Sequence, residues 1–322
     1  MKVLFVYPPN QLMPIETPRP DGSLGLLYLA GALRQIGIEA DILDATLGTN
    51  EDNLEDTFYN AVLQDNGLIR IGMSWQRIEE YLNEKQYDIV GISSNFTSQM
   101  SMVFKVARIA REVNPRCLII AGGVNARNCW QRFQKTGDFD LICLTEAEKA
   151  IVSIVQGETQ IPGTVSFRKR ISKQDWFSGS TAEVYPTQAD SYYADLDQLP
   201  LPTWDKLPLD KYEKVAAPHG VDMTGSSQRY AWLMTSRGCP FRCSYCHIST
   251  EHFGGVSGAI GHLRLKSVPR VLQEIDILEN LGVKKLFIED DSFLAKKARV
   301  KELFTAIQGK GLTIADVNGV NL

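Results

Sequence analysis

One stretch in the second half of the chain decides how the whole sequence is interpreted: residues 229–246 read RYAWLMTSRGCPFRCSYC. An apolar run from Tyr230 to Thr235 opens it and predicts a buried β-strand. Three cysteines, Cys239, Cys243 and Cys246, follow on one loop with the spacing Cys-x3-Cys-x2-Cys. Such a loop can ligate three irons of a four-iron, four-sulfur (4Fe-4S) cluster and leave the fourth iron open for chemistry.

A structural zinc site is the competing interpretation of these cysteines, because His247 or His252 could supply a fourth ligand. Zinc sites typically use two Cys-x2-4-Cys pairs that lie well apart in the sequence, whereas these three cysteines crowd into eight residues. The spacing therefore favours the iron–sulfur cluster. The remaining cysteines are interpreted as small buried apolar residues; they are Cys117, Cys129 and Cys143.

Short apolar runs alternate with helical patterns in the first half of the chain. Five strands are predicted, at residues 3–7, 39–43, 89–93, 117–121 and 141–144. Helices are predicted between them, one of them around residues 51–64. This alternation predicts an α/β domain with a doubly wound parallel sheet of flavodoxin-like order, in which ligands bind beyond the carboxyl ends of the strands.

Polar or small residues gather where these strands are predicted to end: Asn10, Ser93, Ser94, Thr97, Gly122, Gly123, Asn125, Glu146 and Glu148. Paired glycines let the backbone approach a bulky ligand, and hydroxyl or amide groups can bond its polar atoms. These residues are therefore the candidate ligand site of the first domain.

Both halves resemble one known family. The proline-rich first loop, the Gly122-Gly123 pair and the run from Thr145 to Glu148 resemble the cobalamin (B12)-binding domain that precedes many radical S-adenosylmethionine (SAM) domains. The three-cysteine loop matches the radical SAM motif. The resemblance implies a cobalamin-binding domain at 1–155, a hairpin and linker at 156–228, and the N-terminal part of a radical SAM (β/α) barrel at 229–322.

The resemblance also implies roles for particular residues of the second domain. Cys239, Cys243 and Cys246 would bind the 4Fe-4S cluster, and SAM would chelate the open iron. Tyr245 would lie near the adenine of SAM. The run Glu289, Asp290 and Asp291 takes the place of the family element that meets the SAM ammonium group.

The histidines restrict how cobalamin would bind. The chain has four of them, His219, His247, His252 and His262, and none in its first 218 residues. In methionine synthase and the mutases, a histidine of the cobalamin domain ligates cobalt from below. The resemblance therefore implies base-off cobalamin without a histidine lower ligand from this domain.

By resemblance, the chain would be a radical SAM enzyme that reductively cleaves SAM at the cluster and transfers a methyl group to an unactivated centre. Its partners would be a small-molecule or natural-product substrate and an electron donor such as flavodoxin or ferredoxin. Two alternatives remain open. One is a radical SAM methylthiotransferase, whose first domain uses three further cysteines, and the other is a truncated, non-catalytic cobalamin- or cluster-binding protein.

Composition narrows the range of partners. A net charge of -4 with 22% charged residues gives no basic stripe for nucleic acid or anionic lipid. The N-terminus lacks the apolar stretch of a signal peptide and no run approaches the roughly 20 apolar residues of a membrane span, which predicts a cytoplasmic protein. Only about the first half of a radical SAM barrel is recognisable, so we expect a longer enzyme or a second chain that completes the barrel.

Overall fold

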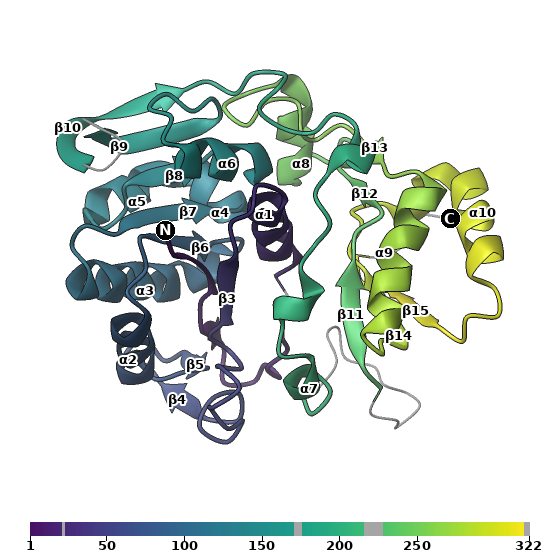
Figure 1. The fold of residues 1–322 in the computed structure, drawn as a ribbon, viewed down its shortest axis with the longest axis horizontal. Coiled ribbons are helices and arrows are strands. Elements are labelled where there is room, and N and C mark those ends of the chain that lie inside the picture. Colours follow the sequence, from purple (N-terminus) through teal and green to yellow (C-terminus); the bar gives the residue numbers. More distant parts are fainter. Residues whose placement is uncertain (21–22, 171–175, 216–227, 319–322) are drawn as a thin grey trace.

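A seven-stranded sheet forms the first part of the chain in this computed structural model, which describes residues 1–20, 23–170, 176–215 and 228–318 (Figure 1). Its strand order is β10-β9-β8-β7-β6-β1-β3. Five strands are parallel: β1 (Val3–Tyr7), β3 (Ala40–Asp44), β6 (Ile89–Ser93), β7 (Leu118–Gly122) and β8 (Leu141–Cys143). Their order, β3-β1-β6-β7-β8, confirms the predicted flavodoxin-like arrangement.

The predicted hairpin is present, but it continues the first sheet. Strand β9 (Thr164–Arg170) pairs antiparallel with β8, and β10 (Trp176–Tyr185) pairs antiparallel with β9. The sheet of the first domain therefore extends beyond residue 155. A hairpin that pairs with an edge strand satisfies backbone groups that this strand would otherwise expose.

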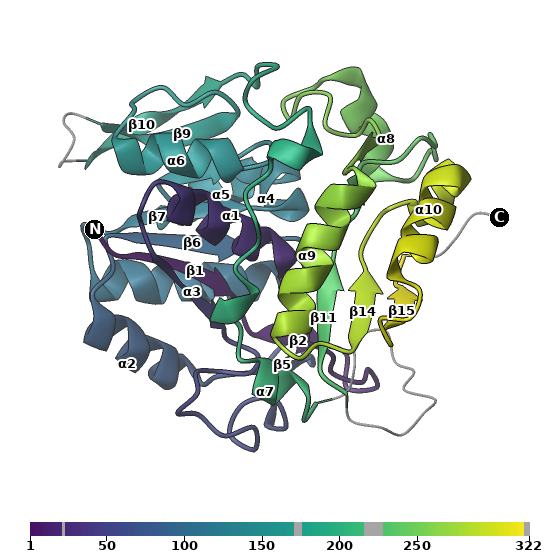
Figure 2. The same ribbon diagram turned by 45° about the vertical axis from the view of Figure 1, so that its right-hand side comes forward.

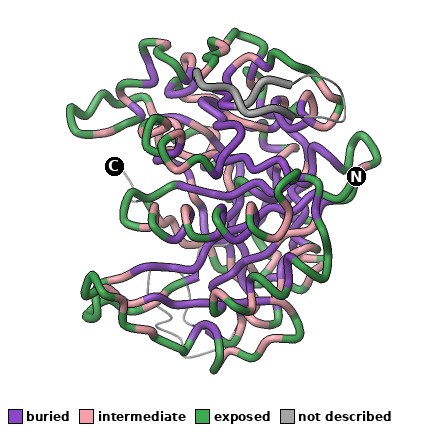
Figure 3. Tube along the Cα trace, turned by 90° about the vertical axis from the view of Figure 1, so that its left-hand side faces the viewer, coloured by how far each residue is buried: buried purple, intermediate pink, exposed green. Residues whose placement is uncertain are grey.

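Helices cover both faces of this sheet. All five residues of β1 are buried, and because successive side chains of a strand point to opposite faces, both faces must be covered. Leu4 and Val6 pack in one core cluster with α2 (Trp75–Lys85) and α3 (Met100–Val113). The opposite face packs against α1 (Leu24–Gln35) and α6 (Glu148–Gln156). Two short helices, α4 (Val124–Asn128) and α5 (Trp130–Thr136), connect β7 to β8. Figure 3 shows the resulting buried interior.

The prediction of a helix around residues 51–64 is wrong. This stretch forms turns followed by β4 (Ala61–Leu63), which joins β2 (Asn10–Leu12) and β5 (Ile69–Ile71) in a small antiparallel sheet. Asn53 explains part of the difference, because its side chain accepts a hydrogen bond from the Asp56 amide at 2.8 Å. Such local side-chain bonds compete with helical backbone bonds.

The second domain begins with three parallel strands, β11 (Tyr230–Leu233), β14 (Lys285–Ile288) and β15 (Thr313–Asp316) (Figure 2). Helices α9 (Val268–Asn280) and α10 (Lys297–Ile307) contribute to the same core. A short antiparallel pair, β12 (Ser236–Arg237) and β13 (Arg264–Leu265), follows β11. Among the helices that the structure describes, none has the length and apolar character needed to cross a bilayer.

Helix α1 packs against both domains (Figure 2). Tyr28 belongs to the same core cluster as Trp232 of β11, whereas Leu33 packs with the first sheet. A Cβ at Gly31 would lie 2.1 Å from the carbonyl oxygen of Leu201, so the linker can cross the helix only because a glycine is there.

A buried ion pair within the second domain binds Tyr28 of α1. The Lys266 ammonium donates to both carboxylate oxygens of Glu274 and to the Tyr28 hydroxyl, each at 2.6 Å. The side chains of Lys266 and Glu274 are 0% exposed. Burial lowers the pKa of Lys266 to about 8, although Glu274 acts in the opposite direction. Arg270 adds a second cation, 3.1 Å from Glu274.

Replacing Lys266 with methionine should lower the free energy of unfolding by about 3 kcal/mol, because Glu274 then keeps a buried charge with a poorer set of partners. The double variant Lys266→Met/Glu274→Leu should lose less than the sum of its single variants in denaturant titrations. Lys310→Met removes a surface lysine as the control and should barely change the unfolding midpoint. Strictly additive losses would contradict the coupling.

Candidate functional site

The three-cysteine loop is held at both ends. Gly238 has φ +78°, and a Cβ there would lie 2.4 Å from the His262 carbonyl oxygen, so the loop can start only with glycine. The Cys239 amide donates to the Gly261 carbonyl at 3.0 Å, and the Cys246 amide donates to the Cys243 carbonyl at 3.1 Å. Between these contacts the chain forms no helix or strand, which leaves the thiols on an irregular loop.

The chemistry of the loop thiols fits a cluster better than that of the other cysteines. Cys243 is exposed, and Cys239 and Cys246 are half-buried. Burial raises the pKa of both Cys117 and Cys143 to about 12, which opposes the thiolate form that metals bind. Burial also raises the pKa of Cys239, which is less deeply buried than these two. Among the described side chains, no three His, Cys, Asp or Glu residues converge into a metal site, so the role of the loop thiols as cluster ligands stays a prediction.

Asp290 anchors the strand that leads into this loop. Its buried carboxylate accepts hydrogen bonds from the amide and hydroxyl of Thr235, both at 2.6 Å, and from those of Ser236 at 3.0 and 2.7 Å. Both oxygens are thus used inside the protein. The structure gives Asp290 a positioning role, and its contact with SAM stays a prediction.

The neighbouring candidates for SAM are placed differently. Burial raises the pKa of the Asp291 carboxyl, although the residue as a whole is exposed, while His247 and the Gly238 amide act in the opposite direction. Asp291 therefore lies beside the cysteine loop, as a SAM contact requires, and Glu289 directly follows β14. Tyr245 is 91% exposed, so its place near an adenine stays a prediction.

Several predicted cobalamin residues come together beyond β6 and β7. The Asn125 side-chain amide donates to the Ser94 hydroxyl at 2.9 Å, and the Thr97 hydroxyl donates to the side-chain oxygen Oδ1 of Asn125 at 3.1 Å. Gly123 has φ +102°, and a Cβ there would lie 2.6 Å from the Ser94 carbonyl oxygen. Glycine is therefore required for this close approach.

The remaining candidates extend this polar edge toward β1. Ser93 and Gly122 face each other as the last residues of β6 and β7. Asn10 is buried and accepts a hydrogen bond from the Gln99 side chain at 2.9 Å. Gln99 was not predicted; its only signal in the sequence was a polar side chain six positions after the predicted end of the strand at residues 89–93.

Glu146 and Glu148 contact the second domain. Arg237, the residue before Gly238, donates to Glu148 at 2.6 Å and lies 2.9 Å from Glu146. Arg264 binds Glu146 through both terminal nitrogens, one of them at 3.1 Å. We call Glu146, Glu148, Arg237 and Arg264 the interdomain clamp. Its arginines were not predicted, and the only hint was an arginine beside the cysteine loop.

Electrostatics favour the charged forms of Glu146 and Arg237. Burial alone would raise the pKa of Glu146, but Arg237 and Arg264 outweigh this effect and hold the pKa below its usual value. Burial would likewise lower the pKa of Arg237, yet Glu148 and Glu146 raise it. The Arg237 guanidinium also stacks on Tyr28, 4.9 Å from the ring centre.

A second ion pair crosses the same interface. Arg127 of α4 lies 2.6 Å from Glu251, which follows the cysteine loop. Because α4 also carries Asn125, this pair and the interdomain clamp bring the polar edge of the first sheet to face the domain that holds the cysteine loop. His247, His252 and His262 lie on that second domain, and His219 lies outside the described residues.

Comparisons with known proteins agree with this layout. Residues 22–155 match the family model of the B12 binding domain, and residues 233–320 match that of the radical SAM superfamily. The chain is 29% identical over 340 residues to cytidylyl-2-hydroxyethylphosphonate methyltransferase of Streptomyces wedmorensis, covering 100% of this chain and 60% of the relative. It is 27% identical over 321 residues to an uncharacterized methyltransferase of Pyrococcus horikoshii, covering 98% and 59%. The chain thus spans about 60% of the length of these relatives.

Two solved structures share the fold. One is the cobalamin-dependent S-adenosylmethionine radical enzyme OxsB, with a TM-score of 0.64 and 18% identity over 98% of this chain and 38% of OxsB. The other is the radical S-adenosylmethionine methyltransferase TsrM of Kitasatospora setae, with a TM-score of 0.61 and 17% identity over 95% of this chain and 50% of TsrM. The chain therefore joins a B12-binding domain to a radical SAM domain.

Proposed function

We propose that the chain acts in a cobalamin-dependent radical SAM enzyme that transfers a methyl group to a small-molecule substrate. One observation carries the proposal: the polar edge of the B12-binding sheet faces the domain with the three-cysteine loop across the interdomain clamp. The two relatives described above are methyltransferases, which supports methyl transfer.

The methylthiotransferase alternative needs further cluster ligands in the first domain. Cys117 and Cys143 are 1% and 4% exposed and belong to the core, while Cys129 packs against that core. Their burial supports the interpretation as small apolar residues.

Each cofactor has a candidate set of residues. When bound, the cluster with SAM supplies reductive radical chemistry and cobalamin supplies a methyl group. We propose that the loop thiols ligate the cluster, that Glu289 and Asp291 bind the SAM ammonium group, and that Tyr245 packs against the adenine. Asp290 holds the start of the loop by fixing Thr235 and Ser236.

The first domain would bind cobalamin through the polar edge. We propose that Ser94, Thr97 and Asn125 hydrogen-bond its polar groups, and that Gly123 leaves room for its bulk. Glu146 and Glu148 are proposed to act through the clamp, since their carboxylates already bind arginines. We also propose that flavodoxin or ferredoxin delivers electrons to the cluster.

Cluster assembly should depend on the loop cysteines alone. A Cys239→Ala/Cys243→Ala/Cys246→Ala variant should lose the iron and sulfide that the parent gains on anaerobic reconstitution, because a cubane needs these thiolates. The matched control, Cys117→Ala/Cys129→Ala/Cys143→Ala, should reconstitute like the parent. A full cluster in the first variant, or its loss in the control, would refute the assignment.

Cobalamin should bind base-off and without a histidine below cobalt, because the first 218 residues contain none. The electron paramagnetic resonance spectrum of the Co(II) form should therefore show no nitrogen superhyperfine splitting from an axial ligand. A His252→Gln/His262→Gln variant should give the same spectrum. Axial nitrogen splitting in the parent would overturn the base-off proposal, and failure to bind cobalamin would overturn methyl transfer.

Loss of the interdomain clamp should impair SAM cleavage without removing the cluster. Arg237→Ala should slow anaerobic formation of 5′-deoxyadenosine by about 10- to 100-fold, because small errors in positioning can cost that much. Iron content should stay at the parent level, since the thiols are intact. Arg34→Ala, which breaks a surface pair with Asp205, is the control. An unchanged rate in Arg237→Ala would rule out a positioning role for the clamp.

A further inference from the structure

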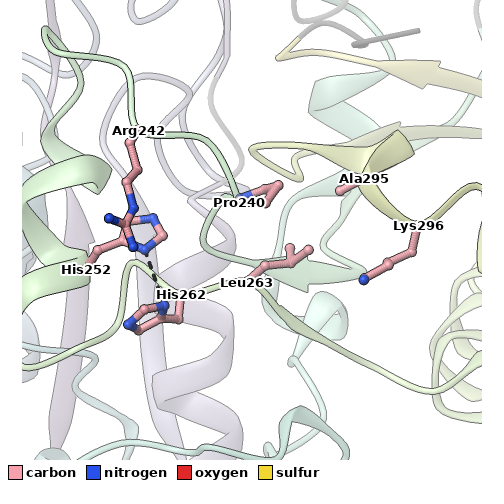
Figure 4. Close-up of a pocket in the computed structure, with 7 residues that line it drawn as sticks. All are labelled: Pro240, Arg242, His252, His262, Leu263, Ala295 and Lys296. Carbon is pink, nitrogen blue, oxygen red and sulfur yellow. Dashed lines mark hydrogen bonds between the residues drawn. The ribbon is translucent and has the colours of Figure 1, made fainter.

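A cavity of about 350 Å³ lies beside the cysteine loop (Figure 4). Pro240 and Arg242 enter it from the loop, between Cys239 and Cys243. The other lining residues are His252, His262, Leu263, Ala295 and Lys296. None of the three cluster cysteines lines it, so this space is distinct from the thiol ligand set.

The lining of this cavity is basic. Four of its seven residues are Arg242, Lys296, His252 and His262, and none of the seven is acidic. The Nδ1 atoms of the two histidines lie 3.2 Å apart. At that separation one ring nitrogen donates a hydrogen bond to the other. Arg242 and Lys296 therefore give the cavity two positive charges.

Neighbouring contacts preserve this arrangement. A Cβ at Gly261 would lie 2.4 Å from the Ile248 carbonyl oxygen, so the close approach that sets His262 against His252 requires glycine. The Arg242 guanidinium lies 5.3 Å from the centre of the Phe253 ring. Glu251, the acid next to His252 in sequence, is paired with Arg127. That carboxylate therefore serves the interface and does not neutralise the cavity.

We propose that this basic cavity binds a dianionic phosphoryl or phosphonyl group of an organic substrate. Two positive charges match a dianion, whereas a single carboxylate would leave one of them uncompensated. The arginine fork suits tetrahedral oxyanions, and lysine adds a point charge. The assignment of this anion as part of the substrate rests on the proposed methyl transfer.

The size and place of the cavity suit a substrate. A volume of about 350 Å³ falls within the range of small-molecule sites, so room remains for the organic part of the ligand. Arg242 stands directly before Cys243, and Lys296 follows the run from Glu289 to Asp291. The bound anion would thus lie next to both segments proposed to hold the cluster and SAM.

Binding can be measured without turnover. The full chain with its cluster reconstituted should be titrated calorimetrically with methylphosphonate, inorganic phosphate and acetate. We expect methylphosphonate to bind at least as tightly as phosphate. Acetate should bind more weakly than methylphosphonate, by a factor of about ten or more. Arg242→Gln/Lys296→Gln should weaken methylphosphonate binding about tenfold or more, because two charge-assisted contacts are lost.

Controls separate the cavity from general charge effects. Lys297→Gln removes the adjacent, exposed lysine that does not line the cavity, and it should bind like the parent. Arg242→Lys keeps the charge without the fork and should show an intermediate affinity. Iron content and the thermal midpoint of each variant verify its folding, and the single variants replace the double variant if it fails to fold.

The proposal is overturned if the double variant binds methylphosphonate like the parent, or if acetate binds as tightly. Binding of inorganic phosphate with exclusion of methylphosphonate would show a free-phosphate site and overturn the substrate assignment. Competition by SAM would assign the cavity to the SAM site and also overturn it. None of these titrations measures methyl transfer. The binding results would therefore be the same if the enzyme proved not to transfer a methyl group.

Discussion

The ion pairs of Arg237 with Glu146 and Glu148 are the contacts on which the relation between the two domains depends. A buried guanidinium is tolerated only when carboxylates compensate its lost hydration. Arg237 stands two residues before the first cysteine of the loop, and the two glutamates follow β8 of the B12-binding sheet. These ion pairs therefore compensate the buried charge of Arg237 and also hold the cysteine-loop domain in contact with the sheet.

Two further sets of contacts, those of Asp290 and those of Tyr28, hold the two domains in this arrangement. The carboxylate of Asp290 ties the end of β14 to Thr235 and Ser236, so the backbone just before Arg237 has one arrangement. On the other side, Tyr28 of α1 contacts both Arg237 and Lys266. Helix α1 belongs to the first domain in sequence, yet its packing makes it part of the core of both.

This construction suits chemistry that needs two cofactors close together. The polar edge around Ser94 and Asn125 and the cysteine loop come from different domains, and only their interface can present both to one substrate. The basic cavity lies beside the same loop and would hold the charged end of a substrate there. Binding energy at such a remote group can be used to orient the reacting end.

The sequence by itself determined the features that depend on local spacing. The three cysteines on one loop, the five parallel strands and the glycine at position 123 all followed from patterns within a few residues. The helix predicted near residues 51–64 failed because Asn53 and its neighbours bond locally, and the joining of the hairpin to the sheet could not be predicted from alternation alone.

Only the tertiary structure decided which distant charges meet. Glu148 was predicted as a ligand residue, but its partner Arg237 lies 89 positions away, and the pairing depends on how two domains pack around α1. The contact between the Nδ1 atoms of His252 and His262 depends in the same way on packing, because the backbone at Gly261 must approach the Ile248 carbonyl oxygen closely. Periodicity reports which side of an element is buried, whereas a buried charge finds its partner through packing, which no local pattern encodes.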